Sequence, residues 1–340
     1  MRTVPVQDAI GMVLCHDLTR IVPGDVKERA FKKGHVVQEE DIQALLEIGK
    51  EHLYVWDLPR GFIHENEAAS RIATAAAGPG ITLTEVCEGR INLIAKEDGL
   101  LKINIEALNS INGIDQMVFG TLHTNQQVNK NRAVAGTRVV PLTIEEKKIE
   151  QVERICQQAF PLVEVKPFLA RNIGMVTTGS EIYKGLIKDR FGPVLKQKFG
   201  TLNGSITRQI FTSDDLAATV NAIKELVDEG ADMVVVTGGM SVDPDDQTPA
   251  AIRATGASVE TYGSPVFPGA MFMLAYLGDV PVVGLPGCVM YYKASIFELI
   301  IPRLMAGERV TRQDVVALGH GGFCESCPDC RYPACPFGKG

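Results

Sequence analysis

The chain has 340 residues, which is longer than one hydrophobic core usually serves, so we expect two or three domains. Its 34 Lys and Arg against 41 Asp and Glu leave a formal net charge of −7, which gives nucleic acid or an anionic membrane no general electrostatic reason to bind. No segment has the apolar length of a signal peptide or a membrane-spanning helix, so a cytoplasmic protein is expected.

Residues 1–168 mix short helices and strands. The segment HVVQEEDIQALLEIGKEHLYVW predicts a helix that ends near Gly49 and a strand from Leu53 to Trp56. After an Ala-rich helical segment, ENEAASRIATAAAG, short β-like runs follow, and the Glu-Asp-Gly within RINLIAKEDGLLKINI is typical of a hairpin turn. We therefore expect an α+β N-terminal region.

Residues 169–312 alternate strands and helices. IGMVTT, MVVVTGG and VPVVGL predict buried strands. Helices are predicted from about Gly192 to Phe199, over DDLAATVNAIKELVDEG, from about Pro249, and over one long segment, VMYYKASIFELIIPRLMAG. Apolar strands that lack alternation and are separated by helices indicate an α/β domain, a mostly parallel sheet covered on both faces in three layers.

Three Gly-containing loops follow the predicted strands: TTGSE, TGGMSVDPDDQTP and LPGCV. The carboxyl ends of parallel strands meet at one edge, where glycines and helix N-termini suit a phosphorylated ligand. Asp246 and Asp214 at this edge would hold a divalent cation that bridges to the ligand. Alternatively, Thr248 is the N-cap of a helix with Pro249 at its first position, and Asp246 only favours the positive end of that helix.

These residues resemble a known family. VVVTGGMSVDPDDQTPAAI resembles the signature of the molybdopterin-binding domain of molybdopterin adenylyltransferases and molybdotransferases, and IGMVTTGSEI and PVVGLPG resemble two further elements of that domain. The resemblance implies that adenylylated molybdopterin receives molybdate with release of AMP, in a homo-oligomer, with a dimer favoured. It assigns catalysis and Mg²⁺ to Asp246 and Asp214. It assigns the bound pterin and its phosphate to Thr178, Gly179, Glu181, Gly238, Gly239, Ser241, Pro286 and Gly287.

The sequence also departs from the molybdotransferases. Their SAMDGYA segment is absent, and Ala270 and Met271 occupy the last two positions of their PGKP element, which removes a lysine. A non-catalytic carrier or sensor that delivers the cofactor to a molybdoenzyme is therefore an alternative. DPDDQTP also resembles the competence-damage-type domain, which implies hydrolysis of a nucleotide pyrophosphate as a further alternative.

The segment 313–340 is rich in cysteine. Cys324, Cys327, Cys330 and Cys335 have the spacing C-x2-C-x2-C-x4-C, which is similar to a ferredoxin run and suits either an iron–sulfur cluster or Zn²⁺. His320 could replace one thiolate in a zinc site. The remaining alternative is a disordered tail of free thiols. For Cys288, which follows Gly287 at a predicted helix start, the alternatives are a thiol of lowered pKa and an inert packed thiol.

Overall fold

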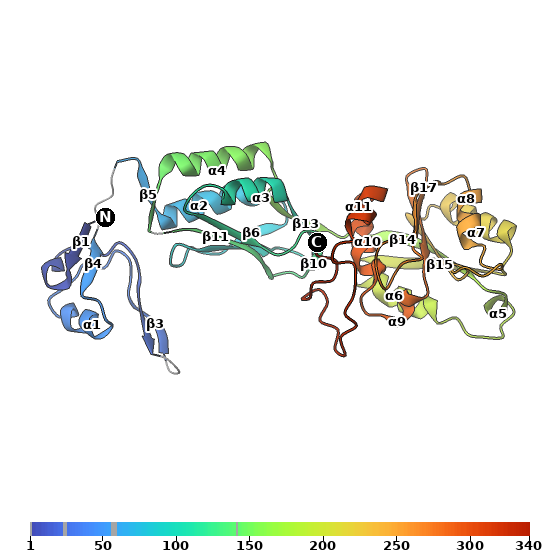
Figure 1. Ribbon diagram of the computed structural model, residues 1–340, viewed down its shortest axis with the longest axis horizontal. Helices are drawn as coiled ribbons and strands as arrows, with labels where there is room; N and C mark the ends of the chain where they lie inside the picture. The colour runs from blue at the N-terminus through green and yellow to red at the C-terminus, as the bar shows by residue number, and fades with distance from the viewer. Residues whose placement is uncertain (1, 23–25, 56–59, 141) are drawn as a thin grey trace. The chain divides into compact units, whose positions relative to one another are not determined.

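The computed structural model describes residues 2–22, 26–55, 60–140 and 142–340 (Figure 1). The chain divides into two compact units. Unit 1 comprises Met1–Lys96, Ile103–Leu122 and Asn131–Glu164, and unit 2 comprises Glu97–Lys102, His123–Lys130 and Val165–Gly340. Across the described ranges, no helix combines the length and the apolar character that a membrane crossing requires.

The first part of unit 1 is a small α+β body. Strand β1 (Arg2–Pro5) pairs antiparallel with β4 (His52–Val55), and the short helices η1 (Val6–Ala9) and α1 (Asp41–Glu47) complete its core. The predicted helix and strand in this segment are confirmed, although Trp56 lies outside the described residues. Two further strands, β2 (Leu18–Val22) and β3 (Val26–Phe31), pair with each other and form an antiparallel ribbon.

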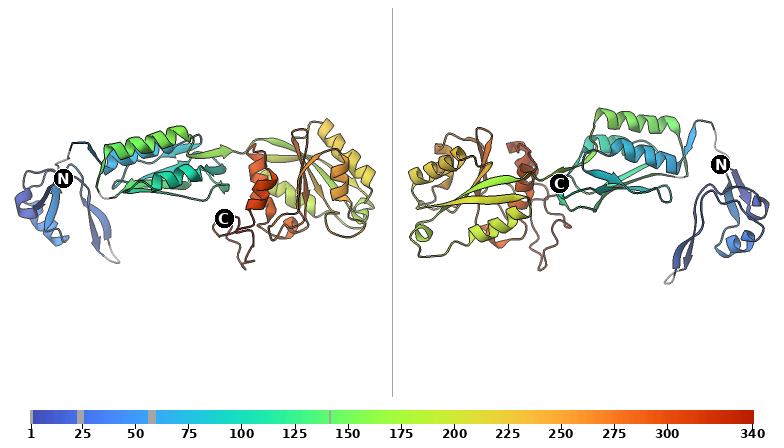
Figure 2. Two further views of the ribbon diagram at one scale, coloured as in Figure 1. Left: turned by 45° about the horizontal axis from the view of Figure 1, so that its top comes forward. Right: turned by 180° about the vertical axis from the view of Figure 1, so that it is seen from behind.

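The rest of unit 1 is an antiparallel sheet with helices packed on it, in the order β6-β7-β11-β9. Helices α2 (Glu65–Ala76) and α4 (Glu146–Gln158) lie side by side (Figure 2). The Arg71 guanidinium of α2 joins them, because it contacts the carboxylates of Glu146 at 2.9 Å and Glu153 at 2.8 Å. The elements are β5 (Phe62–His64), α2 (Glu65–Ala76), β6 (Ile81–Leu83), β7 (Ile91–Ala95), α3 (Ile105–Asn112), β9 (Met117–Thr121), β11 (Ala133–Val139), β12 (Thr143–Glu145) and α4 (Glu146–Gln158).

The prediction of a hairpin turn at Glu97-Asp98-Gly99 is wrong. Both edges of β7 are already paired, one with β6 and the other with β11, so the next strand cannot pair with it. That next strand, β8 (Gly99–Ile103), instead lies in a separate sheet between β10 (Gln126–Val128) and β13 (Val163–Pro167). The turn residues therefore mark a passage between sheets.

Unit 2 contains a six-stranded sheet in the order β15-β14-β16-β19-β18-β17. The first four strands in that order are mutually parallel, and β18 pairs antiparallel with both of its neighbours. The expected mostly parallel sheet is confirmed, with an antiparallel edge added to it. The strands are β14 (Arg171–Thr178), β15 (Gly204–Thr212), β16 (Met233–Thr237), β17 (Ser258–Tyr262), β18 (Met273–Leu277) and β19 (Val280–Leu285).

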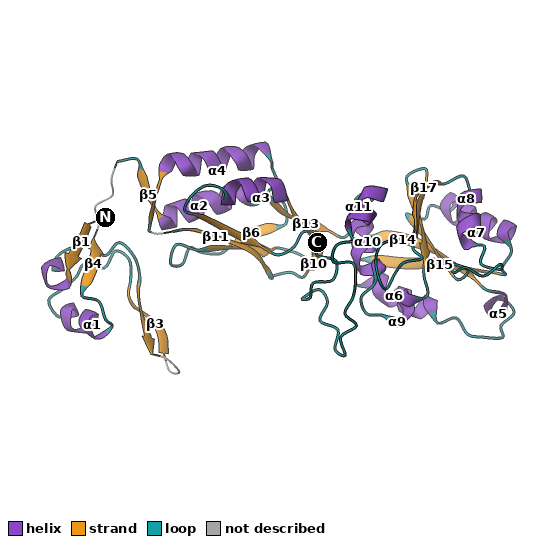
Figure 3. Cartoon of the chain, in the orientation of Figure 1, coloured by secondary structure: helices purple, strands orange, loops and turns teal. Residues whose placement is uncertain are grey.

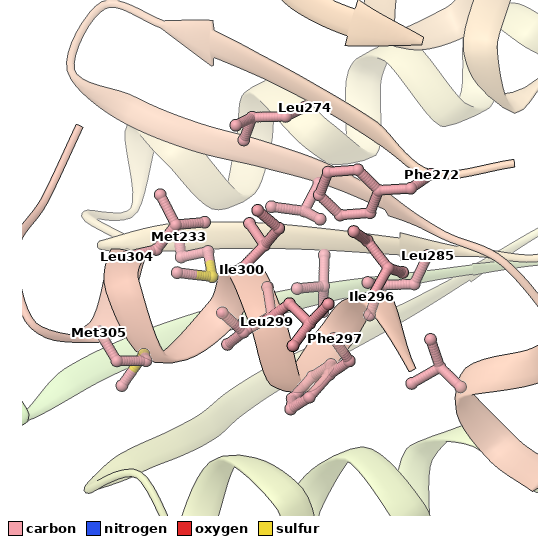
Figure 4. Close-up of a cluster of buried hydrophobic side chains, with 14 of the residues drawn as sticks. Met233, Phe272, Leu274, Leu285, Ile296, Phe297, Leu299, Ile300, Leu304 and Met305 are labelled. Carbon is pink, nitrogen blue, oxygen red and sulfur yellow. The ribbon is translucent and has the colours of Figure 1, made fainter. Parts of the chain in front are cut away.

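Helices cover both faces of this sheet. Alternate residues of β14 separate the two cores, because Ile173 and Met175 point to one face and Val176 to the other. The first core holds α6 (Phe191–Gly200) and α10 (Ile296–Met305). Side chains of α10 lie among Met233 and Leu285 from the sheet and Phe272, which directly precedes β18 (Figure 4). The second core holds α7 (Leu216–Asp228) and α8 (Thr248–Ala254). The predicted three-layer arrangement is thus confirmed.

The prediction of a single long helix after β19 is wrong, because the chain forms two helices there, α9 (Cys288–Tyr291) and then α10. Tyr292 is extended, and Ser295 starts α10 with a capping box that involves Glu298. The Ile296 N–H donates to the Pro268 carbonyl at 3.1 Å, which fixes the start of α10 against a distant segment. After α11 (Arg312–Ala317), the chain to its end is drawn as loop (Figure 3).

Candidate functional site

Four loops leave one edge of the unit 2 sheet, here called the loop edge. Thr177 of β14 is in register with Thr237 of β16, which is in register with Leu285 of β19, and Thr178 is in register with Thr212 of β15. These strands are parallel, so their carboxyl ends coincide. Along the edge the loops follow β15, β14, β16 and β19 in that order, and they begin at residues 213, 179, 238 and 286. The predicted site residues of the α/β domain therefore lie on neighbouring loops.

The loop after β16 lies directly against the end of β14. Gly238 has φ +85°, and a Cβ atom added there would lie 2.3 Å from the Thr178 carbonyl oxygen. Gly239 has φ +54°, and its added Cβ would lie 2.9 Å from the Thr248 hydroxyl oxygen. Both positions combine a left-handed backbone with a close approach, which glycine alone accommodates without strain. The two loops that the family resemblance singles out thus touch through their backbones.

Thr248 holds the two ends of the acidic loop together. Its hydroxyl donates to the Gly238 carbonyl at 2.8 Å, and its N–H donates to the Gly239 carbonyl at 3.1 Å. The expected N-cap role of Thr248 is wrong, because α8 begins at Thr248 itself and Gln247 is the N-cap. The buried hydroxyl finds its partner in the preceding turn rather than in the helix. This closing role was missed in the sequence, where Thr248 matched a helix-start pattern.

Asp214 connects two loops. Its Oδ2 accepts a hydrogen bond from the Ser180 N–H at 2.9 Å, so the acid after β15 fixes the loop after β14. The neighbouring Asp215 is the N-cap of α7 and accepts from the Ala218 N–H at 2.6 Å. Of the two aspartates expected at the start of this helix, Asp214 is therefore the one turned to the loop edge.

Asp246 closes its own loop. Its Oδ2 accepts from the Asp243 N–H at 3.0 Å, and its N–H donates to the Asp243 carbonyl at 2.9 Å. The loop tip is exposed, with Val242 78% accessible. Of the other predicted residues, Thr178, Gly179 and Pro286 are buried, and Ser241, Glu181 and Gly287 are exposed.

The loop edge has no preformed metal site. Within the described ranges, no three His, Cys, Asp or Glu side chains are close enough together to hold an ion. Asp214 and Asp246 each use one carboxylate oxygen for a backbone N–H. Mg²⁺ is usually held by one or two carboxylates together with substrate phosphates and water, so this donor set fits Mg²⁺ that arrives with a phosphorylated ligand.

Two further polar residues support the loop edge and were not identified from the sequence. The Gln209 side-chain amide on β15 donates to the Thr177 hydroxyl at 2.9 Å and to the Asp189 carboxylate at 2.7 Å. Asp189 also accepts from the Phe191 N–H at 2.8 Å at the start of α6. The sequence signal was an Asp just ahead of a helix, which is an ordinary capping pattern.

Cys288 is a packed thiol. Burial raises the pKa of this thiol, and the side chain contacts the core beneath α9. Nearby, burial also raises the pKa of Glu298, whose carboxylate is paired with Lys198. Of the two interpretations of Cys288, the inert one agrees with this environment.

The cysteine tail folds back onto unit 2. The Cys324 N–H donates to the Phe267 carbonyl at 2.8 Å, and the Tyr332 hydroxyl donates to the Glu298 carbonyl at 3.1 Å. Phe337 is 3% exposed and belongs to the core that contains α10. The sequence showed no apolar stretch long enough to dock the tail, and the docking instead uses single aromatic residues, Tyr332 and Phe337, together with backbone contacts.

A match to a known protein family covers the domain that contains the loop edge. Residues 174–306 match a family described as "Probable molybdopterin binding domain", and residues 3–57 match a "Domain of unknown function (DUF8806)". A molybdopterin molybdenumtransferase of Staphylococcus aureus (strain COL) is 29% identical over 134 residues, 36% of this chain and 31% of the relative. A CinA-like protein of Citrifermentans bemidjiense is 32% identical over 89 residues, 26% of this chain and 21% of the relative.

The chain thus spans less than a third of the length of either curated relative. Among solved structures, the molybdopterin biosynthesis enzyme MoaB of Thermus thermophilus is similar to 41% of this chain over 98% of its own length, with 16% identity and a TM-score of 0.34.

Proposed function

Residues 174–306 belong to the molybdopterin-binding domain family, and from this premise we propose that the chain acts in molybdenum cofactor biosynthesis. It binds adenylylated molybdopterin at the loop edge and inserts molybdate as AMP leaves. The domain from 169 to 312 carries this activity, flanked by an N-terminal region (1–168) and the cysteine tail (313–340). We expect it to work as a homodimer.

The observation that carries the proposal is where the loops lie. The first three strands of the domain have the spatial order β15-β14-β16, so β15 is added on one side of β14 and β16 on the other, and the strand order reverses between β14 and β16. In open α/β sheets, ligands bind outside the carboxyl ends of the strands at such a reversal. The loops there are those of Thr178–Gly179 and Gly238–Gly239, whose backbones are in contact.

The roles of the residues follow from their contacts. Gly238 and Gly239 let the turn pass close against Thr178 and Thr248, which hold it in place, and the backbone of this turn is where we expect a ligand phosphate to bind. Asp214 keeps the first turn of α5 (Ser180–Tyr183) fixed through the Ser180 N–H. When bound at Asp214 and Asp246, Mg²⁺ would neutralise the phosphates and stabilise the charge that develops as AMP leaves.

A second candidate function is favoured by the segment 268–271. Gly269 keeps φ +142°, and its added Cβ would lie 2.5 Å from the Ile296 Cβ, so the turn is retained. Ala270 and Met271 follow it where the molybdotransferases carry a lysine, so this turn offers no cation to an anion. A protein that binds the pterin without transferring molybdate, and delivers it to a molybdoenzyme, agrees with that loss.

The test is an anaerobic incubation of the full chain with adenylylated molybdopterin, molybdate and Mg²⁺. Molybdate-dependent AMP release with recovery of metal-loaded pterin is the expected result. Tight pterin binding without AMP would establish the carrier instead, and AMP release without molybdate would establish a pyrophosphate hydrolase. Failure to bind the pterin would refute both the transferase and the carrier.

A variant pair tests the cation. Asp246→Asn should weaken pterin binding at least tenfold in Mg²⁺ and little in its absence, since the amide still closes the turn but no longer attracts the ion. Asp245→Asn is the matched control, because its exposed side chain makes no hydrogen bond within the described ranges. Equal losses with and without Mg²⁺ would reduce Asp246 to a loop-closing residue.

A further inference from the structure

The four tail cysteines line one cavity. This tail cavity has a volume of about 260 Å³ and lies between the tail and the segment that joins α9 to α10. Its walls combine all four thiols with aromatic and proline side chains, including Phe323, Tyr332 and Phe337. All four thiols face this cavity, although within the described residues no three of them lie close enough together to hold a single metal ion.

The tail is anchored on both sides of the cysteine run. Cys324 and Cys335, the outer pair, pack against the core, and the hydrogen bonds of Cys324 and Tyr332 fix the backbone near each of them. Cys327 and Cys330, the inner pair, are exposed and lie on a segment without helix or strand. The outer thiols are thus set in place, and the inner two can close over whatever fills the cavity.

The spacing then indicates the occupant. Cys324, Cys327 and Cys330 recur at every third residue, and Cys335 is followed by Pro336, which is close to the bacterial ferredoxin pattern C-x2-C-x2-C-x3-C-P. In two-cluster ferredoxins the fourth cysteine binds the other cluster, but this chain has one such run, and its fourth cysteine lines the same cavity as the first three. We propose that the tail cavity binds one [4Fe–4S] cluster through these four thiolates.

The size of the cavity separates a cluster from zinc. Four thiolates close around a single Zn²⁺ with bonds of about 2.3 Å and leave no internal space. The tail thiols of the described structure stand farther apart than a single ion requires, and the space between them suits a larger group such as a cluster. Arg331 and Lys293, which line the cavity along with Glu325, give it a net positive charge suited to an anionic iron–thiolate group.

One short helix, α9, connects the loop edge to the tail cavity along the chain. Tyr291 ends α9 and lines the cavity, and α9 begins directly after Gly287 of the fourth loop. The cluster proposal itself stands apart from the proposed function, because it depends only on the tail and its contacts.

The experiment is anaerobic reconstitution of the full-length chain with ferrous iron and sulfide, with equimolar Zn²⁺ present in a parallel sample. We expect about four iron and four acid-labile sulfide per chain, with the visible absorption of a cluster and an electron paramagnetic resonance signal after reduction. Cys327→Ser and Cys330→Ser should each lower iron and sulfide severalfold. Cys87→Ser, an exposed cysteine of unit 1, should leave both unchanged.

The inner cysteines are exposed, so their serine variants should keep the fold, which circular dichroism and thermal unfolding will verify. One zinc per chain with no sulfide, iron without sulfide, or a wild-type chain without bound metal would each overturn the proposal. So would an equal loss in Cys87→Ser. Pterin binding measured on the same samples reports separately on the loop edge.

Discussion

Replacing Gly238 with alanine is the sharpest test of the contact between the two central loops. At φ +85°, an alanine costs about 1–2 kcal/mol from its backbone conformation alone. Its Cβ would also lie 2.3 Å from the Thr178 carbonyl oxygen, a backbone atom that can move only with the end of β14. Overpacking of this kind adds about 1–3 kcal/mol. We therefore expect Gly238→Ala to lower the free energy of unfolding of unit 2 by about 2–5 kcal/mol.

Gly230→Ala provides the matched control. Gly230 has nearly the same φ, +88°, but an added Cβ there meets no atom within 4 Å. Gly230→Ala should therefore lower the free energy of unfolding only by the about 1–2 kcal/mol that the backbone conformation of the alanine costs. Thermal unfolding of both variants, at about 2–4 °C per kcal/mol, resolves the difference.

Pterin binding completes the test. Separation of the two loops should weaken binding in Gly238→Ala and leave it unchanged in Gly230→Ala. Equal destabilisation by the two substitutions, or unaltered binding in Gly238→Ala, would refute the idea that this contact shapes the site.

Two further predictions concern the tail and unit 1. Phe337→Ala should release the tail, because loss of a core phenylalanine costs about 3–5 kcal/mol, and the release should appear as faster proteolysis within residues 320–340. Phe323→Ala, which removes an exposed side chain, is the control. If Phe337→Ala and the wild type were equally protected from the protease, the docking of the tail would be contradicted. Burial lowers the pKa of His64 in the folded chain. As the pH falls below about 6.5, His64 therefore takes up a proton in the unfolded chain before it does so in the folded chain. The free energy of unfolding of unit 1 should then fall by at most about 1.4 kcal/mol per pH unit. His64→Asn, which can still cap α2, should flatten this fall in the thermal midpoint; an unchanged slope would exclude His64 as its source.

The central strands of unit 2 could be predicted from the sequence because they are buried on both faces. β14, β16 and β19 are continuous apolar runs, and their shared edge follows from parallel pairing. β15 was missed because it is the edge strand, and its polar residues, such as Gln209, face solvent or the loop edge. The β17–β18 hairpin, joined by a ten-residue connection, carries no short turn signal.

Long-range contacts explain what the sequence could not reveal about the helices and the site. The break between α9 and α10 is fixed by Pro268, a residue more than twenty positions earlier. The closing role of Thr248 depends on a turn that its own sequence pattern does not encode. The hydrogen bond between Asp214 and Ser180 joins two loops that follow different strands. It could be predicted from the sequence only if the order of those strands in the sheet could be predicted.

The strand order also sets a length scale. The loop of Asp214 follows β15 and that of Gly287 follows β19, three strand spacings or roughly 14 Å apart. Substitutions this far apart usually have additive energies. Only an elongated ligand that contacts both ends could make the two loops energetically interdependent, so their coupling in a double-mutant cycle measures how much of the edge a given ligand spans.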